Sequence, residues 1–180
     1  AFSYRFTHAV WSVRQAALYG FRFQLEKMLE PRGAKLDDPT FQAVVARLTD
    51  QQMDVRNEAV ITLRQVRSRS IVAPLVLHSL KDGHPLVRQN ASITLGSLGG
   101  DGEEAVSFLI EVLRDPDTKV VEAAWTALQR ITGREFDRTY AWWRDWYEDE
   151  EKRVEYVCPE HPSVSENSAG LCPKCSNALR

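Results

Sequence analysis

The sequence predicts an all-α fold: an α-solenoid that continues into a Trp-rich capping helix, with a small separate module at the C-terminal end. Two series of residues between Leu48 and Leu128 recur together every 32–33 residues. A Trp-rich segment follows the last repeat, and all three cysteines of the 180 residues lie within the last 23. A fixed period of this length is typical of stacked helical repeats. An odd number of closely spaced cysteines indicates a metal site more than a disulfide framework.

Residues 1–38 are predicted to form an atypical N-terminal helical cap. The motif Val13-Arg14-x-x-Ala17 echoes the second half of each repeat, but Val13 precedes Val55 by 42 residues, so the register is lost. Terminal repeats are usually atypical, which favours a cap on the first repeat. In the alternative interpretation, this region is a surface helix that docks on a larger partner. The docking residues would then be Trp11, Tyr19 and Phe23.

Residues 39–153 are predicted to hold the repeats and the capping helix. The first series is Leu48-x-Asp50, Leu80-x-Asp82 and Leu113-x-Asp115, and the second is Val55…Ala59…Leu63, Val87…Ala91…Leu95 and Val120…Ala124…Leu128. The middle unit shows two apolar stripes at helical spacing, separated by the Gly- and Pro-containing segment Lys81–Pro85. Each unit is therefore expected to be a pair of helices, which buries its stripes only by stacking on its neighbours.

Helix starts are marked in the sequence by acidic residues. Asp38-Pro39 combines a good N-cap residue with proline at the first helical position. Asp101-Gly102-Glu103-Glu104 and Asp117 are expected to begin later helices in the same way, because carboxylates also oppose the positive end of the helix dipole.

The repeat motifs resemble those of the HEAT repeat family, in its short bacterial form. The resemblance is carried by Asp54-Val55-Arg56-x-x-Ala59 and Leu86-Val87-Arg88-x-x-Ala91, with Leu95-Gly96 following, and covers about residues 39–133. In the third unit Val121 stands where the first two have Arg56 and Arg88. The resemblance implies a HEAT-like α-solenoid, an architecture that mostly offers a binding surface.

Arg56 and Arg88 have two interpretations. They could line an anion-binding groove, or they could pair with Asp50 and Asp82, or with neighbours of these, in a ladder between successive repeats. The resemblance to HEAT repeats favours the ladder, because such repeats commonly use these Asp and Arg positions structurally.

The segment Trp142-Trp143-Arg144-Asp145-Trp146-Tyr147 is predicted to be the capping helix. Trp142 and Trp146 share one helical face, and Trp143 and Tyr147 share the next. Together with Ile131–Phe136, the segment resembles a terminal element common in bacterial HEAT-like proteins. One face would seal the open end of the solenoid, which a repeat array needs for solubility. The alternative is an exposed Trp pair that binds a partner.

Residues 154–180 are predicted to form a Cys3His metal-binding module, a small zinc knuckle or ribbon. Cys158-Pro159-Glu160-His161 and Cys172-Pro173-Lys174-Cys175 each place two ligands three positions apart. Three thiolates and one imidazole favour a single structural Zn²⁺ with a full tetrahedron, held by Cys158, His161, Cys172 and Cys175. The alternatives are a transferable metal cargo and redox-active or metal-free thiols.

The C-terminal module also resembles the heavy-metal-binding domain of copper-efflux proteins. The resemblance is carried by the spacing of the four ligands and their prolines, over residues 156–180. Two departures are visible: Glu160 stands where that family usually has Met, and Ser176-Asn177 where it usually has Gly-Met. Both thioethers suited to Cu(I) are therefore missing, which favours zinc.

Composition and motifs narrow the function to protein interaction. A net charge of −2 argues against a general nucleic-acid binder, and no apolar run is long enough to span a membrane. Phosphate-binding loops, dinucleotide fingerprints and nucleophile elbows do not occur. We therefore expect a non-enzymatic scaffold subunit that stabilises a larger protein assembly, including one at a membrane, in the cytoplasm or the periplasm. The alternatives are a metal-handling or metal-sensing protein and a HEAT-like lyase-type enzyme.

Overall fold

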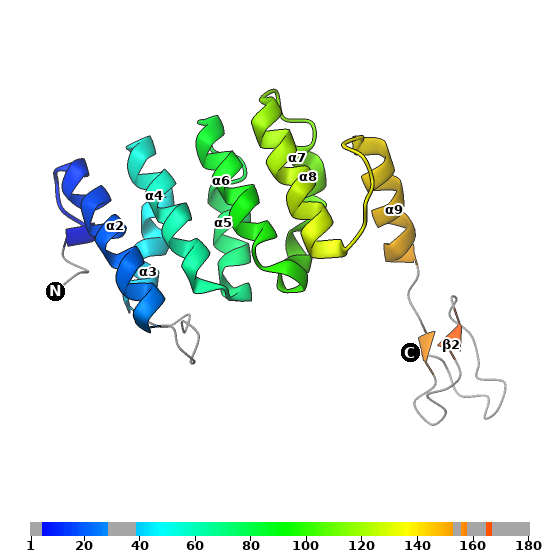
Figure 1. Ribbon diagram of the computed structural model, residues 1–180, viewed down its shortest axis with the longest axis horizontal. Coiled ribbons are helices and arrows are strands. Elements are labelled where there is room, and N and C mark those ends of the chain that lie inside the picture. Colours follow the sequence, from blue (N-terminus) through cyan, green and yellow to red (C-terminus); the bar gives the residue numbers. More distant parts are fainter. Residues whose placement is uncertain (1–4, 29–38, 153–155, 158–164, 167–180) are drawn as a thin grey trace. The chain divides into compact units, whose positions relative to one another are not determined.

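The computed structural model describes residues 5–28, 39–152, 156–157 and 165–166. The chain divides into two compact units, Ala1–Tyr140 and Ala141–Arg180 (Figure 1). The first unit holds the helices α2 to α8, and the second holds nearly all of α9 and a short pair of strands. The predicted domain boundaries at residues 38 and 153 lie outside the described residues.

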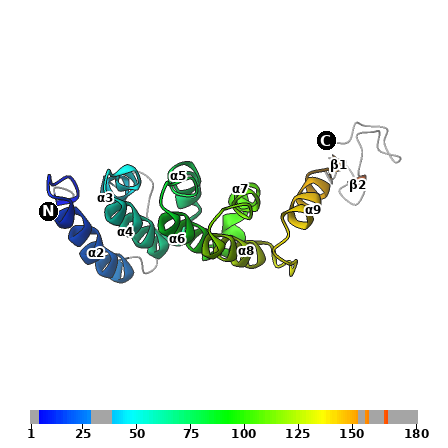
Figure 2. The same cartoon turned by 90° about the horizontal axis from the view of Figure 1, so that it is seen from above.

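The first unit is a two-layered α-solenoid. One layer consists of the second helices of the repeats, which lie side by side in chain order (Figures 1 and 2): α2 (Trp11–Met28), α4 (Met53–Leu63), α6 (Pro85–Gly96) and α8 (Thr118–Thr132). The other layer consists of the first helices: α3 (Pro39–Val45), α5 (Val72–His78) and α7 (Val106–Val112). The predicted α-solenoid is confirmed.

Two helices, α3 and α8, begin where the sequence predicts. Proline is the first residue of α3 and of α6, where its missing N–H is no loss. The Asp117 carboxylate accepts hydrogen bonds from the backbone N–H groups of Lys119 and Val120 and so caps α8. The acidic segment near residue 101 differs from the expectation: it lies in the 3-10 helix Gly99–Ala105, and α7 starts only after it.

The repeating apolar residues form the core. In each unit the Val, Ala and Leu of the second series are completely buried, and the leucines of the first series are nearly so. The two layers meet along these side chains, so the period seen in the sequence is the period of the packing. Because each pair of helices buries its stripe only against its neighbours, the core runs through the unit without interruption.

One glycine allows two second helices to approach closely. A Cβ atom at Gly96 in α6 would lie only 2.7 Å from Ala127 Cα and 2.8 Å from Ala127 Cβ in α8. Real Cβ atoms do not come so near to a backbone atom, so α6 and α8 can cross at this distance only without a side chain at residue 96. The Leu95-Gly96 motif therefore has a packing role.

The segment after the last repeat is anchored to α8. Gly133 ends that helix in the left-handed conformation, with φ of 68°, where glycine is favoured. The Trp125 indole N–H then donates a hydrogen bond of 2.7 Å to the Phe136 carbonyl, and the Arg138 guanidinium lies over the Trp125 ring. These contacts hold the turn that the sequence places between the repeats and the Trp-rich helix.

The second unit contains the predicted Trp-rich helix as α9 (Tyr140–Lys152). Trp143 is fully buried and stacks edge-to-face on Trp146, whereas Trp142 is largely exposed. That α9 seals the last repeat stays a prediction. Beyond it, β1 (Tyr156–Val157) pairs antiparallel with β2 (Ser165–Glu166). In the described part of the chain, every helix is too short or too polar to cross a membrane.

Candidate functional site

A ladder of arginine–aspartate pairs links the repeats along one edge of the solenoid. Arg14 pairs with Asp50, Arg56 with Asp82 and Arg88 with Asp115, so each arginine reaches the aspartate of the following repeat. Every pair is bidentate: Nε and Nη2 each donate to one carboxylate oxygen, over 2.6–2.9 Å. This fork geometry gives the strongest and most directional of the common ion pairs.

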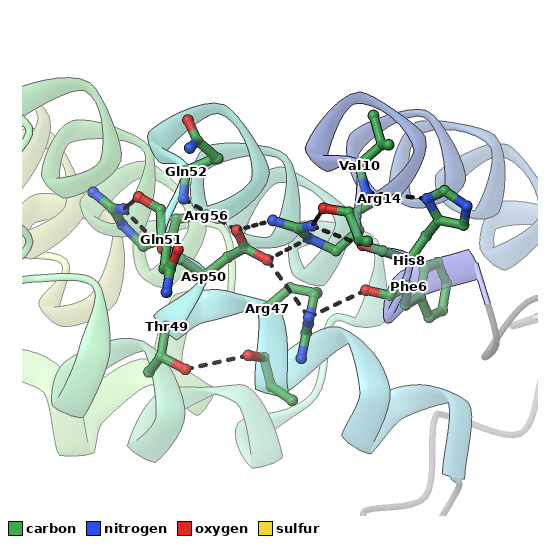
Figure 3. A network of polar contacts seen from close by, with 12 residues as sticks. Phe6, His8, Val10, Arg14, Arg47, Thr49, Asp50, Gln51, Gln52 and Arg56 are labelled. Atoms are coloured by element: carbon green, nitrogen blue, oxygen red, sulfur yellow. Dashed lines mark hydrogen bonds and ion pairs between the residues drawn. The ribbon is translucent and has the colours of Figure 1, made fainter.

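The remaining hydrogen bonds of each pair fix the loops before the second helices. Arg56 Nη1 donates to the Asp50 carbonyl, and Arg88 Nη1 donates to the Asp82 carbonyl. Each aspartate also accepts from the backbone N–H two residues later, as Asp50 does from Gln52 (Figure 3). One arginine thus holds its own loop and the next one together.

The ladder begins at His8, which occupies the position of an aspartate. Its carbonyl accepts from Arg14 Nη1 at 2.7 Å, and its Nδ1 accepts from the Val10 N–H at 3.1 Å (Figure 3). These are the two bonds that Asp50 and Asp82 make at the same place in their repeats. At the other end, Val121 replaces the arginine, and Asp115 is the last acceptor of the ladder.

The structure confirms the ladder interpretation of Arg56 and Arg88 and specifies their partners. Arg56 pairs with Asp82 and Arg88 with Asp115, and not with the aspartate of their own repeat. Arg14 was not predicted as a member of the ladder, because the distance from Val13 to Val55 breaks the period. The signal was present in Val13-Arg14-x-x-Ala17: the additional residues lie between Arg14 and Asp50 and leave the pairing unchanged.

The ladder keeps its carboxylates charged. Burial alone would raise the pKa of Asp50, Asp82 and Asp115, but the hydrogen bonds from arginine and from backbone N–H groups outweigh it. The pKa of each therefore lies below its ordinary value. Groups of this kind stabilise the fold above the pKa of the unfolded chain, about 3.9, and lose that contribution as pH falls further.

We expect Arg56→Met to lower the free energy of unfolding by about 2 kcal/mol, because it leaves the nearly buried Asp82 carboxylate without its bidentate donor. Methionine keeps much of the apolar stem, so packing changes little. Urea unfolding followed by circular dichroism measures the loss. Arg69→Met is the matched control: its bridge to Glu104 is exposed, at 64% and 54% of the two side chains, and should have almost no effect. Equal losses in the two variants would contradict a structural ladder.

A second cluster of charges lies between α2 and α4. The Glu58 side chain is mostly buried, and its Oε1 lies 3.1 Å from Arg22 Nη1. The Arg22 guanidinium also lies over two aromatic rings, 4.8 Å from the centroid of Tyr19 and 5.5 Å from that of Phe23. Burial raises the pKa of Glu58, and the charge of Arg22 opposes this only in part.

Glu58 should give the fold a pH dependence opposite to that of the ladder. A carboxyl whose pKa is raised on folding stabilises the fold at low pH and loses this contribution as pH rises through the folded pKa. We therefore expect the unfolding temperature to rise as pH is lowered from 7 toward the ordinary pKa of glutamate, about 4.3, and to fall below about pH 3.9 as the ladder aspartates are protonated. Glu58→Gln should remove the rise and keep the fall. An identical rise in Glu58→Gln would assign it to another group.

From the sequence, the contact surface was expected on the second helices, around Asn57, Arg64, Gln89 and Glu122. Glu122 is exposed and Gln89 is half-exposed. Asn57 on α4 and Arg64, in the 3-10 turn that follows α4, are linked through Asn90 on α6: Asn90 Nδ2 donates to Asn57 Oδ1 at 2.8 Å, and Arg64 Nη2 donates to Asn90 Oδ1 at 3.2 Å.

The aromatic residues of the N-terminal region divide into two groups. Phe6 and Phe21 are buried and stack edge-to-face. Trp11, Tyr19 and Phe23 are 40%, 51% and 51% exposed. α2 therefore buries one face against α4, as a solenoid cap does, and presents the three predicted docking residues to solvent. That these three residues dock on a partner stays a prediction.

The predicted zinc ligands Cys158, His161, Cys172 and Cys175 lie outside the described residues. Within the part of the chain that the structure describes, no group of three or more His, Cys, Asp or Glu side chains could hold a metal ion. The described strands β1 and β2 flank the segment that contains Cys158 and His161.

Comparison with known proteins decides the family. The sequence profile of HEAT repeats matches residues 41–129 and 80–154, which together make up more than half of the chain. The chain belongs to the HEAT repeat family. The match covers α3 to α8, the predicted HEAT-like repeats, and includes the segment of α9. A comparison with curated proteins finds no match.

Proposed function

We propose that this HEAT repeat protein is a non-enzymatic interaction subunit that holds or stabilises a larger protein assembly. HEAT repeats are generally protein-interaction scaffolds. The observation that carries the proposal is the set of exposed aromatic side chains on α2: Trp11, Tyr19 and Phe23 are 40–51% exposed, and Tyr19 packs edge-to-face on Phe23. Exposed Trp and Tyr are characteristic of the residues that dominate protein interfaces.

The contact surface is the outer side of the second helices together with the aromatic face of α2. The Arg–Asp ladder runs along the edge of the same layer and holds the helices in a fixed row, so a partner meets a preformed surface. A rigid surface lowers the ordering cost of association. The polar side chains of this row, Asn57, Gln89 and Glu122 among them, would provide the specificity.

The C-terminal module would carry one structural zinc ion, held by Cys158, His161, Cys172 and Cys175. The proposal is supported by the donor set, which fills a tetrahedron, and by the resemblance to heavy-metal-binding domains. The β1–β2 pairing supports it further, because it places Val157 opposite Ser165, the two described residues on either side of the segment that contains the first two ligands. A filled tetrahedron leaves no open position for chemistry.

A metal-handling function is the second candidate, and the same donor set favours it. In that case the module would exchange a soft metal ion reversibly with a partner. The absence of both Met residues at the family positions favours structural zinc over copper transfer. A site that releases its metal only on unfolding would eliminate this candidate.

Gentle purification from the native source tests the proposed function. We expect the chain to elute within a large complex, and mass spectrometry of that complex identifies the partner. A tagged Tyr19→Ala, Phe23→Ala double variant should lose the partner. Phe108→Ala, which removes an exposed aromatic side chain from the opposite layer, should retain it. A stable monomer without partners would overturn the proposal.

A further inference from the structure

Arg64 differs from the other largely covered arginines of the solenoid in its partners. Arg14, Arg22, Arg47, Arg56 and Arg88 each lie within 4 Å of a carboxylate. Arg64, by contrast, donates to two neutral acceptors, Thr94 Oγ1 at 3.4 Å and Asn90 Oδ1 at 3.2 Å. Among the side chains that the structure describes, which do not include those of residues 24–38, no acidic group lies within ion-pair distance of it.

The environment of Arg64 makes this charge costly. Its side chain is half-buried at the C-terminal end of α4, in the 3-10 turn Arg64–Val66, which contacts α2. Burial lowers the pKa of Arg64, and the positive charge of Arg22 on α2 lowers it further. Buried charges are normally paired, because a neutral acceptor satisfies a hydrogen bond but does not compensate the lost hydration of an ion.

The guanidinium is nevertheless held in a fixed orientation. Asn90 donates its own N–H to Asn57 and thereby turns its carbonyl oxygen toward Arg64. Thr94, one turn further along α6, accepts a hydrogen bond from Arg64 Nε. Two of the five N–H donors of the guanidinium are used in this way, and three remain. A planar fork of this kind suits a carboxylate.

The neighbours indicate which kind of carboxylate fits. Among the described side chains, Arg64 and Arg22 carry two positive charges beside one carboxylate, that of Glu58, which leaves an excess of positive charge. The half-exposed rings of Tyr19 and Phe23 flank Arg22. A nucleic acid would require several phosphates to be neutralised, and neither one unpaired arginine nor a chain of net charge −2 provides this. An acidic side chain next to apolar or aromatic ones complements the cluster.

We propose that Arg64 receives an aspartate or glutamate side chain from an acidic, aromatic-containing segment of a protein partner that lies across α2, α4 and α6. The inference rests on the proposed interaction function and names the chemistry of the partner. The partner's carboxylate would accept from the free N–H groups of Arg64, and its apolar side chains would cover Tyr19 and Phe23. Asn90 and Thr94 would keep the guanidinium in place before the partner binds.

A peptide titration of the full chain tests this without the native partner. The probe is acetyl-Glu-Glu-Phe-Glu-Glu-Phe-amide, and the matched control peptide has Gln in place of every Glu. We expect the Nε–H resonance of Arg64 in the ¹⁵N spectrum to shift with saturation for the Glu peptide only. Arg64→Gln should weaken binding at least about fivefold, the effect of losing one charge-assisted hydrogen bond at an accessible site. Arg69→Gln, an exposed arginine of the same charge, should leave binding unchanged.

Three outcomes would overturn the inference. The first is that the Glu and Gln peptides bind equally well, or that the Glu peptide binds Arg64→Gln as tightly as the unmodified chain. The second is tighter binding of inorganic phosphate or of a thymidine oligonucleotide, which would assign the site to phosphate. The third is an Arg64 resonance that the Glu peptide leaves unchanged, which would mean that a segment of this chain already covers the guanidinium. If the native partner still co-purifies with the chain in any of these cases, the proposed interaction function is retained and only the proposed role of Arg64 is lost.

Discussion

Gly96→Ala should lower the free energy of unfolding by about 1–3 kcal/mol, the usual cost of forcing a side chain into a closed contact. Helix propensity predicts the opposite sign, since Gly→Ala inside a helix normally gains about 1 kcal/mol. Packing dominates here, because the new Cβ would meet Ala127 Cα at 2.7 Å and a backbone atom cannot move away by a rotamer change. Thermal or urea unfolding of the purified variant measures the difference.

Gly20→Ala is the control for the Gly96 prediction. Gly20 also lies inside a second helix, α2, but a Cβ there would meet no atom within 4 Å. This variant should be slightly more stable than the unmodified chain. The double variant Gly96→Ala, Ala127→Gly should recover only part of the loss, because the contact with the Ala127 backbone remains. A stabilised Gly96→Ala would show that α6 and α8 separate at little cost.

If the proposed zinc site is formed, Cys172→Ser should abolish zinc binding and unfold residues 156–180, while the helical circular dichroism stays nearly intact. A segment of this length cannot be held by apolar burial alone, so metal binding, worth on the order of 10–16 kcal/mol in small zinc modules, would supply its folding energy. The solenoid has its own core and does not depend on that ion. Metal analysis of the purified chain and amide NMR spectra provide the two measurements.

The control for the zinc prediction lies in the same segment. Asn177→Ala changes a residue that is not a proposed ligand and should retain one zinc ion per chain. Loss of most of the helical signal in Cys172→Ser would show that the two parts fold as one. Full zinc content in that variant would mean that Cys172 is not a ligand. Release of the metal by a chelator without unfolding would support metal handling over a structural role.

The fold could be predicted from the sequence down to the apolar stripe of each second helix, because the three repeats show the same residue pattern three times. The Val, Ala and Leu positions of the second helices are all buried, and α3 and α8 begin at the expected residues. The N-terminal repeat was harder to recognise. Its ladder arginine, Arg14, is shifted out of period by the residues between α2 and α3, and periodicity arguments fail where a loop changes length.

The candidate surface could be predicted only in part. The exposed aromatic side chains of α2 were named from the sequence, and so were aspartates as partners of the arginines, but which arginine pairs with which aspartate was not. That depends on which helix faces meet, and sequence spacing does not show that Arg56 reaches Asp82 while Arg64 donates to Asn90 and Thr94. For the same reason sequence spacing does not show that His8 occupies the first position of the ladder.

The two ends of the ladder bear on how copies of this chain can associate. A repeat array is in principle extendable, since the last repeat of one copy could stack on the first repeat of another and build a filament. Such a joint would need an arginine from the trailing repeat and an aspartate from the leading one. Here the trailing position is Val121 and the leading position is His8, so neither charge is supplied. The Arg–Asp pairing of the ladder therefore cannot continue between the Val121 repeat of one copy and the His8 turn of another.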